Sequence, residues 1–336
     1  MKRVHIIATG GTIASKAAAG GGAALPTLSA QDLVTAVPEL RDVAEVSFEQ
    51  FANVASQALT LDQLVALGRR VKEVFDRREA DGVVITQGTM TMEESSYLWD
   101  LMLERAGAVI VTGAMRHSSL PSPDGPRNLL DAVIAAASPA TRTLGVLVCM
   151  NGELHAARDV VKFHSLSVES FRSPEVGPVG FVRSGRVDLW RTPVDDHRPI
   201  SVDRISAGVA LVPIVAADDG RLITAAAQMA DGLVLQLMGG GAVPPPCVPV
   251  IAKAIEHMPV IGVSRCAAGS MYENVYAFEG GDKQLRELGV IFAGSLSGLK
   301  ARLKLMLYLS AHPRPALGST EMHAWRRDLA AAFPNI

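Results

Sequence analysis

The stretch Gly82-Val83-Val84-Ile85-Thr86-Gln87-Gly88-Thr89 passes from an apolar run into a polar turn that contains a glycine. The apolar part has the length of a buried strand, and a helical pattern follows it over residues 92–105. A strand that leads directly into a helix is the repeating unit of a parallel sheet covered by helices. The stretch therefore predicts an α/β fold, with a turn that can bind a ligand at the carboxyl end of one strand.

The same alternation of apolar strands and amphipathic helices extends to both sides of this stretch. In the first half of the chain, strands are expected over 4–8, 43–49, 82–86, 108–111 and 144–150, and helices over 30–37, 61–77, 92–105 and 127–137. A second series follows, with strands over 209–214, 232–237 and 259–263 and helices over 248–256, 300–310 and 319–332. We therefore expect two α/β domains. The larger N-terminal domain has a mostly parallel sheet flanked by helices, and the smaller C-terminal domain has a parallel sheet.

The length of 336 residues also fits two domains of about 150 residues each. Residues 191–204 are polar and contain prolines, which is typical of a connection between domains. The predicted boundaries are an N-terminal domain over 1–190, a linker over 191–207 and a C-terminal domain over 208–336. Within the first domain, residues 16–24 are almost all alanine and glycine, and we expect a mobile loop there.

Charge and composition exclude several classes of partner. The chain has 32 Lys and Arg residues against 34 Asp and Glu, a net charge of −2, so neither nucleic acid nor an anionic membrane is an expected partner. Its three cysteines are too few and too scattered for a disulfide framework or a cysteine metal site. No apolar run reaches the roughly 18 residues of a membrane span, and the N-terminal one is too short for a signal peptide. We expect a cytoplasmic protein that binds a small molecule and holds no metal ion.

Three polar turns are expected at the carboxyl ends of strands, where parallel sheets bind ligands. They are Thr9-Gly10-Gly11-Thr12, Thr86-Gln87-Gly88-Thr89 and Thr112-Gly113-Ala114-Met115. Glycine allows the backbone to approach a ligand, and free N–H groups there can hold an oxyanion. Taken alone, each turn more often reflects a threonine that caps a helix. A nucleotide site is excluded, because the chain has neither the GxGxxG spacing nor a GxxxxGK[ST] motif.

Two of these turns resemble the signature sequences of a known enzyme family. Ala8-Thr9-Gly10-Gly11-Thr12-Ile13-Ala14 resembles the first signature of the bacterial-type asparaginase/glutaminase family, and residues 82–94 resemble the second. Further segments resemble the family in the same order: 36–40, 56–57, 112–116, 124–126, 158–162, 177–178 and 300–303. The resemblance implies a two-domain α/β amidohydrolase without a cofactor that assembles as a homo-oligomer, a dimer or a tetramer. In such an assembly each active site lies in an N-terminal domain and is closed by a neighbour's C-terminal domain.

The resemblance also implies the catalytic residues. A threonine hydroxyl attacks the amide carbon of the substrate and an acyl-enzyme forms. Thr12 matches the nucleophile on the flexible loop, while Thr89 and Lys162 match a second threonine and the base that activates it; a partly desolvated lysine suits that task. Ser56 matches the residue that binds the substrate carboxylate. The other residues predicted to line the substrate site are Gly11, Gln57, Gly88, Met90, Ala114 and Tyr276.

Simpler interpretations of these residues stay open. Without its motif, Lys162 would be interpreted as a solvated surface lysine and Ser56 as a helix cap. Residues 16–27 also lack the tyrosine that assists the first threonine in the family. Either threonine can therefore be the first nucleophile, and Tyr272 or Tyr276 can stand in for the missing tyrosine.

The second signature departs from the family at positions that bind the substrate. The family has a histidine and an aspartate where this chain has Gln87 and Met90, and the aspartate contacts the α-ammonium group of the substrate. Alignment also puts Ala242 and Tyr276 where the family has an amide and a carboxylate. A buried ammonium group without an anionic partner is costly. We therefore expect a substrate that lacks a free α-ammonium group, such as the ω-amide of a dicarboxylic acid or an N-acylated asparagine.

Two other functions stay open at this point. One is an ordinary L-asparaginase that tolerates Met90. The other is a catalytically silent sensor that keeps the pocket and uses it to bind a small amide or acid. Ammonia release from free asparagine separates the two enzymes, and a covalent intermediate separates an enzyme from a sensor.

Overall fold

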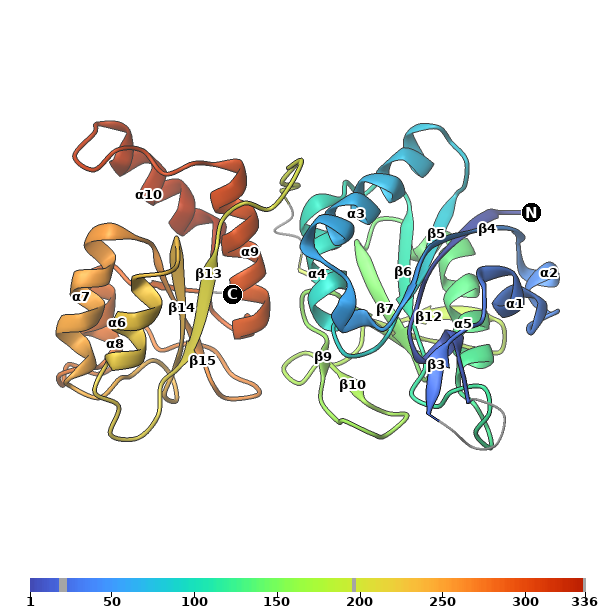
Figure 1. The fold of residues 1–336 in the computed structure, drawn as a ribbon, viewed down its shortest axis with the longest axis horizontal. Helices are drawn as coiled ribbons and strands as arrows, with labels where there is room; N and C mark the ends of the chain where they lie inside the picture. The colour runs from blue at the N-terminus through green and yellow to red at the C-terminus, as the bar shows by residue number, and fades with distance from the viewer. Residues whose placement is uncertain (18–22, 195–197, 335–336) are drawn as a thin grey trace. The chain divides into compact units, whose positions relative to one another are not determined.

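The computed structural model describes residues 1–17, 23–194 and 198–334 (Figure 1). The chain forms two compact units, Met1–Pro199 and Ile200–Ile336, and each is considered by itself. This division falls inside the predicted 191–207 linker; the bounds of the domains and of the linker stay a prediction. Residues 18–22 of the expected alanine and glycine loop, and residues 195–197 of the linker, lie outside the described residues.

The first unit is built on an eight-stranded sheet in the order β12-β11-β8-β7-β6-β5-β1-β4. Strands β7, β6, β5, β1 and β4 are parallel, whereas β8, β11 and β12 run antiparallel to their neighbours. A mostly parallel sheet with helices around it confirms the predicted fold class. The strands are β1 (Arg3–Gly10), β4 (Glu45–Val54), β5 (Gly82–Thr86), β6 (Ala108–Thr112), β7 (Val146–Met150), β8 (Glu153–Ala156), β11 (Gly180–Arg183) and β12 (Arg186–Leu189).

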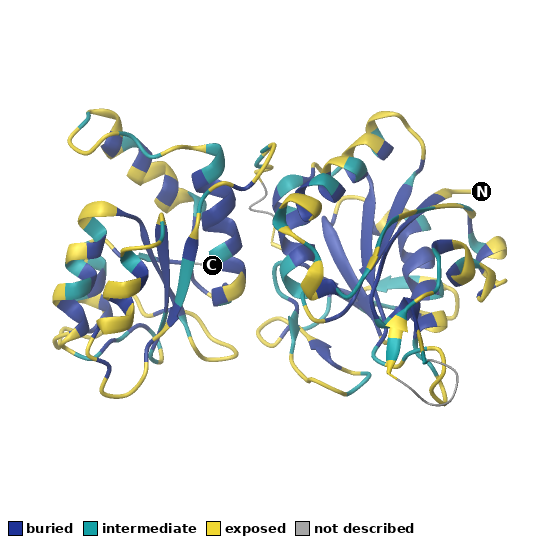
Figure 2. Ribbon diagram, in the orientation of Figure 1, coloured by how far each residue is buried: buried dark blue, intermediate teal, exposed yellow. Residues whose placement is uncertain are grey.

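Helices cover both faces of this sheet (Figure 1). The helices α3 and α4 pack on one face, and α5 packs on the other together with α1 and α2. All five residues of β5 are buried (Figure 2), because successive side chains point to opposite faces and both faces are covered. The helices are α1 (Ala30–Thr35), α2 (Leu40–Val43), α3 (Leu61–Asp76), α4 (Met92–Met102) and α5 (Gly125–Ala137), with short 3₁₀ turns η1 (Thr12–Ala14), η2 (Ser56–Ala58) and η3 (Pro139–Thr141).

Four further short strands form two hairpin-like pairs outside the main sheet. β2 (Ser15–Ala17) pairs with β3 (Ala24–Pro26), and β9 (Val161–Lys162) pairs with β10 (Phe171–Arg172), both antiparallel. The first pair flanks the expected mobile loop, so both ends of that loop are held in a ladder. The second pair places Lys162 opposite Phe171.

The sequence analysis missed β8, β11 and β12, although their turns carry a signal. Asn151 and Gly152 connect β7 to β8, with φ angles of 52° and 79°, and Ser184 and Gly185 connect β11 to β12 with 50° and 74°. An Asn-Gly pair with positive φ at both positions is typical of a tight hairpin. The strands themselves have four residues each, which is too short for their alternation to be distinctive.

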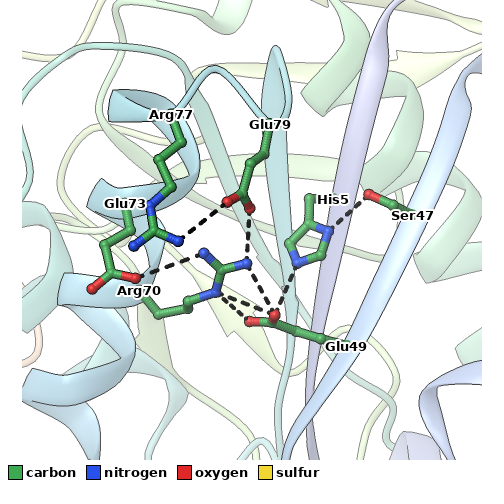
Figure 3. A network of polar contacts seen from close by, with 7 residues as sticks. All are labelled: His5, Ser47, Glu49, Arg70, Glu73, Arg77 and Glu79. Atoms are coloured by element: carbon green, nitrogen blue, oxygen red, sulfur yellow. Dashed lines mark hydrogen bonds and ion pairs between the residues drawn. The ribbon is translucent and has the colours of Figure 1, made fainter.

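A polar network ties α3 to β4 at the edge of the sheet (Figure 3). Arg70 on α3 donates to both carboxylate oxygens of Glu49 on β4, at 2.9 and 3.1 Å, and to Glu79 at 2.8 Å. These carboxylates raise the pKa of Arg70 further above its usual range. His5 on β1 lies 3.4 Å from Glu49 and 2.8 Å from Ser47. The network thereby secures the strand whose end leads into η2.

The second unit has a four-stranded parallel sheet in the order β13-β14-β15-β16. Its three longer strands and three of its helices lie where the sequence predicts them, whereas the short elements α6, α8 and β16 were missed. No helix in the described ranges is both long and apolar enough to cross a membrane. The elements are β13 (Val209–Pro213), α6 (Arg221–Ala227), β14 (Gly232–Leu237), α7 (Cys247–His257), β15 (Val260–Ser264), α8 (Asp282–Leu288), β16 (Ile291–Phe292), α9 (Gly298–Ala311) and α10 (Glu321–Ala332).

Candidate active site

Three backbone segments meet at the carboxyl ends of β1, β4 and β5. Gly11 has a φ angle of 81°, and a Cβ atom on it would lie 2.3 Å from the Cα atom of Gly88. A Cβ atom on Gly88 would in turn lie 2.9 Å from Oγ of Ser56. Only glycine fits at these two positions without displacing its neighbour. The glycines of both signature turns therefore bring Thr12, Thr89 and Ser56 to one edge of the sheet.

Lys162 and Thr89 form a direct contact between an amine and a hydroxyl. Nζ of Lys162 donates a hydrogen bond to Oγ1 of Thr89 at 2.8 Å. Thr89 is buried and Lys162 is half-buried. Burial lowers the pKa of Lys162, and the nearby Glu93 carboxylate partly opposes this shift. In its neutral form the amine accepts the Thr89 proton at the same distance, so the pair can activate the hydroxyl as a nucleophile.

Thr12 lies in the short turn η1 directly after Gly11. The turn is fixed by two hydrogen bonds to the carbonyl oxygen of Gly11, from the backbone N–H of Ala14 at 3.0 Å and from Oγ of Ser15 at 2.8 Å. The Thr12 side chain is half-buried, and its hydroxyl has no hydrogen-bond partner within the described ranges. Among the described residues, an amine thus contacts the Thr89 hydroxyl, whereas none contacts the hydroxyl of Thr12.

Ser56 presents a buried hydroxyl with an unsatisfied hydrogen-bonding capacity. Its side chain is 3% exposed, and its Oγ has no partner among the described residues. The helix-cap interpretation is wrong, because Thr60 caps α3 by accepting from the backbone N–H of Gln63 at 3.2 Å. A buried polar atom next to Gly88 is suited to bind a ligand, since leaving it unpaired is costly. Gln57, which follows it, is exposed.

The Gln87 side chain links the turn after β5 to the start of α4 through hydrogen bonds. Its side chain is fully buried, accepts a hydrogen bond from Oγ of Ser95 at 2.7 Å and donates one to Oγ1 of Thr91 at 3.3 Å. Both partners belong to the start of α4, so Gln87 fixes the path of the chain between β5 and that helix. We infer that the glutamine at this position supports the turn through α4 and leaves ligand contact to its neighbours.

The third predicted turn packs against the second. A Cβ atom on Gly113 would lie 2.4 Å from the carbonyl oxygen of Gln87. Ala114 is fully buried, and Asp124 fixes the residues after it by accepting from the backbone N–H groups of Met115 at 2.9 Å and Arg116 at 2.8 Å. The Ala114 side chain packs in the hydrophobic core beside Ile13 and Leu129, so its predicted contact with a substrate stays a prediction.

Two of the three positions predicted to decide substrate choice, Met90 and Tyr276, are exposed in the single chain. Met90, next to Thr89, is 63% exposed. Tyr276 belongs to the second unit, where it is 44% exposed and its ring centroid lies 5.3 Å from those of Tyr272 and Phe278. Ala242 is also in the second unit and is half-buried. Among these positions, the described part of the first unit brings only Met90 to the Thr89 turn.

Sequence reasoning missed one residue that acts on the site. Glu93 lies in the first turn of α4 and is close enough to Lys162 to affect its pKa. Its place four residues after Thr89, at the start of a predicted helix, was the available signal. Within the described ranges, no group of three His, Cys, Asp or Glu side chains is arranged to hold a metal ion.

Two sequence models of known families match the chain. The model described as "Asparaginase, N-terminal" matches residues 3–195, and the model described as "Glutaminase/Asparaginase C-terminal domain" matches residues 208–317. Together they extend over both units of the fold.

Individual proteins and a solved structure are similar over most of their length. L-asparaginase 2 of Escherichia coli (strain K12) is 32% identical over 330 residues, with 94% of this chain and 91% of that protein covered. A probable L-asparaginase of Deinococcus radiodurans is 34% identical over 316 residues, covering 92% and 94%. The crystal structure of a probable cytoplasmic L-asparaginase from Campylobacter jejuni superposes with a TM-score of 0.83 at 30% identity, covering 97% of this chain and 99% of that one.

Proposed function

This chain belongs to the bacterial-type asparaginase family of amidohydrolases, and from that premise we propose that it hydrolyses a small amide lacking a free α-ammonium group, through a threonine acyl-enzyme. The contact of 2.8 Å between Lys162 Nζ and Thr89 Oγ1 is the observation that carries the proposal. It joins a half-buried base to a buried hydroxyl, in the turn that also packs against the unpartnered hydroxyl of Ser56.

The proposed reaction has two halves. In the first, the attacking threonine oxygen bonds to the amide carbon as its proton passes to Lys162, directly if the oxygen is that of Thr89 and by way of the Thr89 hydroxyl if it is that of Thr12. The bond between carbon and nitrogen then breaks, and the nitrogen leaves as ammonia or an amine with that proton returned by Lys162. In the second half, water attacks the ester, the threonine oxygen regains a proton, and the acid is released. Backbone N–H groups at the Gly11 and Gly88 turns would stabilise the oxyanion of both tetrahedral intermediates. The buried Ser56 hydroxyl would bind the substrate carboxylate.

The proposed substrate class follows from the side chains that would surround an α-ammonium group of the substrate. At position 90 it has a thioether, and at positions 242 and 276 it has Ala242 and Tyr276. None of these side chains carries a negative charge, so an α-ammonium group held among them would lose its hydration without gaining an ionic partner. The ω-amide of a dicarboxylic acid or an N-acylated asparagine avoids this cost.

The proposal includes an assembly of copies, a dimer or a tetramer. Tyr272, Tyr276 and Phe278 form an exposed aromatic group in the second unit, at 44%, 44% and 54% exposure, and such groups mark contact surfaces. We assign this group to the cover over a neighbouring copy's Thr89 turn. Light scattering measures the oligomeric state, and a Tyr276→Ala variant with normal assembly but altered KM for the amide would support this role.

Hydrolysis of L-asparagine itself is the second candidate function. It is favoured by the names of the relatives, which include L-asparaginase 2 and, for a protein of Pseudomonas fluorescens biotype A that is 40% identical over 200 residues, glutaminase-asparaginase. That match covers 59% of this chain. High efficiency on free L-asparagine would establish this candidate in place of the first.

We place the protein in the cytoplasm. Cys149, Cys247 and Cys266 are all unpaired, as is common where thiols stay reduced, and the Campylobacter jejuni structure is described as probably cytoplasmic. A Haemophilus influenzae relative, 32% identical over 327 residues, is named as probably periplasmic. Fractionation of cells followed by immunodetection separates the two compartments.

The direct test is to trap the acyl-enzyme. Purified protein is mixed with succinamate or N-acetyl-asparagine, quenched in acid and analysed by intact-mass and peptide mass spectrometry. We expect a mass increase equal to the acyl group less the one hydrogen that it replaces, carried by the peptide of Thr12 or of Thr89, and no increase in the Thr89→Val variant. Binding of the amide without any acyl-enzyme or ammonia would identify a sensor and end the proposal.

A further inference from the structure

We propose that the second unit carries a binding site for a small amphipathic carboxylate, in an apolar cavity rimmed by three arginines beneath α10. The cavity has a volume of about 510 Å³ and is lined by residues of α7, β15, α8, β16 and α10 and of the segments that flank them. This volume is in the range of sites that bind small molecules. Its lining shares no residue with the Thr89 site.

The walls of the cavity are mostly apolar, and the charged side chains that line it are all positive. Sixteen residues line it, and none of them is an aspartate or a glutamate. The charged ones are Arg286, Arg314 and Arg326. The larger apolar side chains of the wall are Met258, Val260, Phe292, Trp325, Leu329 and Phe333.

Two of the arginines lie together at the carboxyl end of α7. Arg314 donates from Nη2 to the carbonyl oxygen of Glu256 at 3.1 Å, and Arg326 donates from Nη2 to that of Ile255 at 3.4 Å. The Nε atom of Arg314 is buried and has no hydrogen-bond partner within the described ranges. Burial and the neighbouring charge of Arg326 both lower the pKa of Arg314, as expected for two guanidinium groups without a carboxylate between them.

The third arginine lies against the apolar wall. The guanidinium of Arg286 is 4.2 Å from the centroid of the Phe292 ring, and it donates from Nη2 to the carbonyl oxygen of Tyr272 at 2.8 Å. A guanidinium group has five N–H donors, so each of the three arginines keeps donors beyond the bonds named here.

Capping of α7 explains only part of this arrangement. Arginines do satisfy the last carbonyl groups of helices, and that accounts for one hydrogen bond from each of Arg314 and Arg326. It accounts neither for the buried, unpartnered Nε nor for an open cavity between apolar walls, since protein interiors are otherwise closely packed. An apolar body with one carboxylate matches both features, because guanidinium groups bind carboxylates with paired, charge-assisted hydrogen bonds.

The position of the cavity separates it from the catalytic machinery in sequence. The match to the C-terminal family model ends at residue 317. Trp325, Arg326, Leu329 and Phe333 of the lining all come after it. Part of the site is thus supplied by a segment outside the matched domain.

Calorimetry on the full-length protein tests the proposal with decanoate as the probe. Decanol, which has the same chain length without the charge, is the matched ligand, and Trp325 in the wall gives a second readout by fluorescence. We expect decanoate to bind at one site per chain and decanol to bind at least about tenfold more weakly. The Arg326→Gln variant should weaken decanoate binding by about tenfold or more, whereas Arg327→Gln, the adjacent arginine that does not line the cavity, should leave it unchanged.

Several results would overturn the proposal. No binding of decanoate, equal binding of decanol, or equal weakening by Arg326→Gln and Arg327→Gln would each show that the arginine rim does not recognise a carboxylate. Thermal unfolding without ligand confirms that each variant is folded. If Arg326→Gln unfolds, Arg286→Gln replaces it with the same expected loss. A ligand that binds only as the protein changes its oligomeric state would identify the cavity as an interface between copies.

Discussion

Replacing Lys162 by methionine removes the proposed base while keeping a side chain of similar length. Nζ and Oγ1 of Thr89 are 2.8 Å apart, which is within the range for direct proton transfer. The variant therefore loses the transfer itself, and the expected decrease in kcat is about 100- to 10,000-fold, the usual contribution of a general base. KM should change little, because the proposed role of Lys162 is to accept a proton from Thr89 and not to bind the substrate.

The same substitution should not destabilise the fold. Burial lowers the pKa of Lys162, so the folded protein holds its proton less tightly than the unfolded chain does. The resulting cost to stability is fully present below the folded pKa and fades as the pH rises toward the ordinary lysine value. Methionine carries no such cost, and this gain offsets the loss of the hydrogen bond to the buried Thr89 hydroxyl, so below the folded pKa the variant should melt within about 5 °C of the parent protein.

Ammonia release from succinamate is the assay, measured from neutral to alkaline pH. In the parent protein, kcat should rise with pH until Lys162 is neutral, with a midpoint below the usual lysine pKa, and this limb should vanish in the variant. The kcat of Lys162→Met is compared with that of Thr89→Val and of the double variant. If the two residues act as one unit, the free-energy losses of the single variants do not add up in the double variant. If the Lys162→Met variant keeps more than about a tenth of the parent kcat, or if the losses in the double variant multiply, Lys162 is not the base that acts on Thr89.

Three further substitutions test other parts of the account. Met90→Asp restores an anion for an α-ammonium group and should raise kcat/KM for L-asparagine relative to succinamate by about tenfold or more, while the neutral Met90→Asn should not; an unchanged ratio in the ammonia assay would remove Met90 from the explanation. Gly11→Ala places a Cβ atom 2.3 Å from Gly88, so kcat/KM should fall by about a hundredfold, and parent-like kinetics would contradict the packing. Arg70→Met removes the guanidinium group that donates to the Glu49 carboxylate. It should lower the free energy of unfolding in urea by about 1 to 3 kcal/mol. The exposed pair of Lys72 and Asp76 should lose less than about 0.5 kcal/mol on Lys72→Met, and equal losses would contradict the network in Figure 3.

The long elements of the fold could be predicted because each of them carries a complete periodic pattern. The helix expected over 61–77 is observed as Leu61–Asp76, and the strand over 82–86 as Gly82–Thr86. The antiparallel strands beyond β7 could not be found in this way, because four residues give two alternations at most. There the turn residues Asn151 and Gly152 contained more information than the strands they connect.

The sequence proposes members of the candidate site but not the contacts between them. The signature turns point to Thr12 and Thr89, and the segment 158–162 points to Lys162. The proposed chemistry depends on a hydrogen bond across 73 sequence positions that no local pattern encodes. The two glycine contacts and the orphan Ser56 hydroxyl likewise arise only when three strands end side by side. The effect of the Glu93 carboxylate on the pKa of Lys162 also depends on contact between segments that are far apart in the sequence.

The ratio of kcat/KM for succinamate to that for L-asparagine shows whether the chain disfavours a free α-ammonium group. Both substrates release ammonia, both offer the same amide to the Thr89 and Lys162 pair, and they differ by one α-ammonium group. We expect a ratio above about ten, because the ammonium would be buried without an anion. We also expect the Thr89→Val variant to release no ammonia from either substrate. A ratio below one would mean that the chain binds the ammonium after all, and that Met90 does not set its substrate.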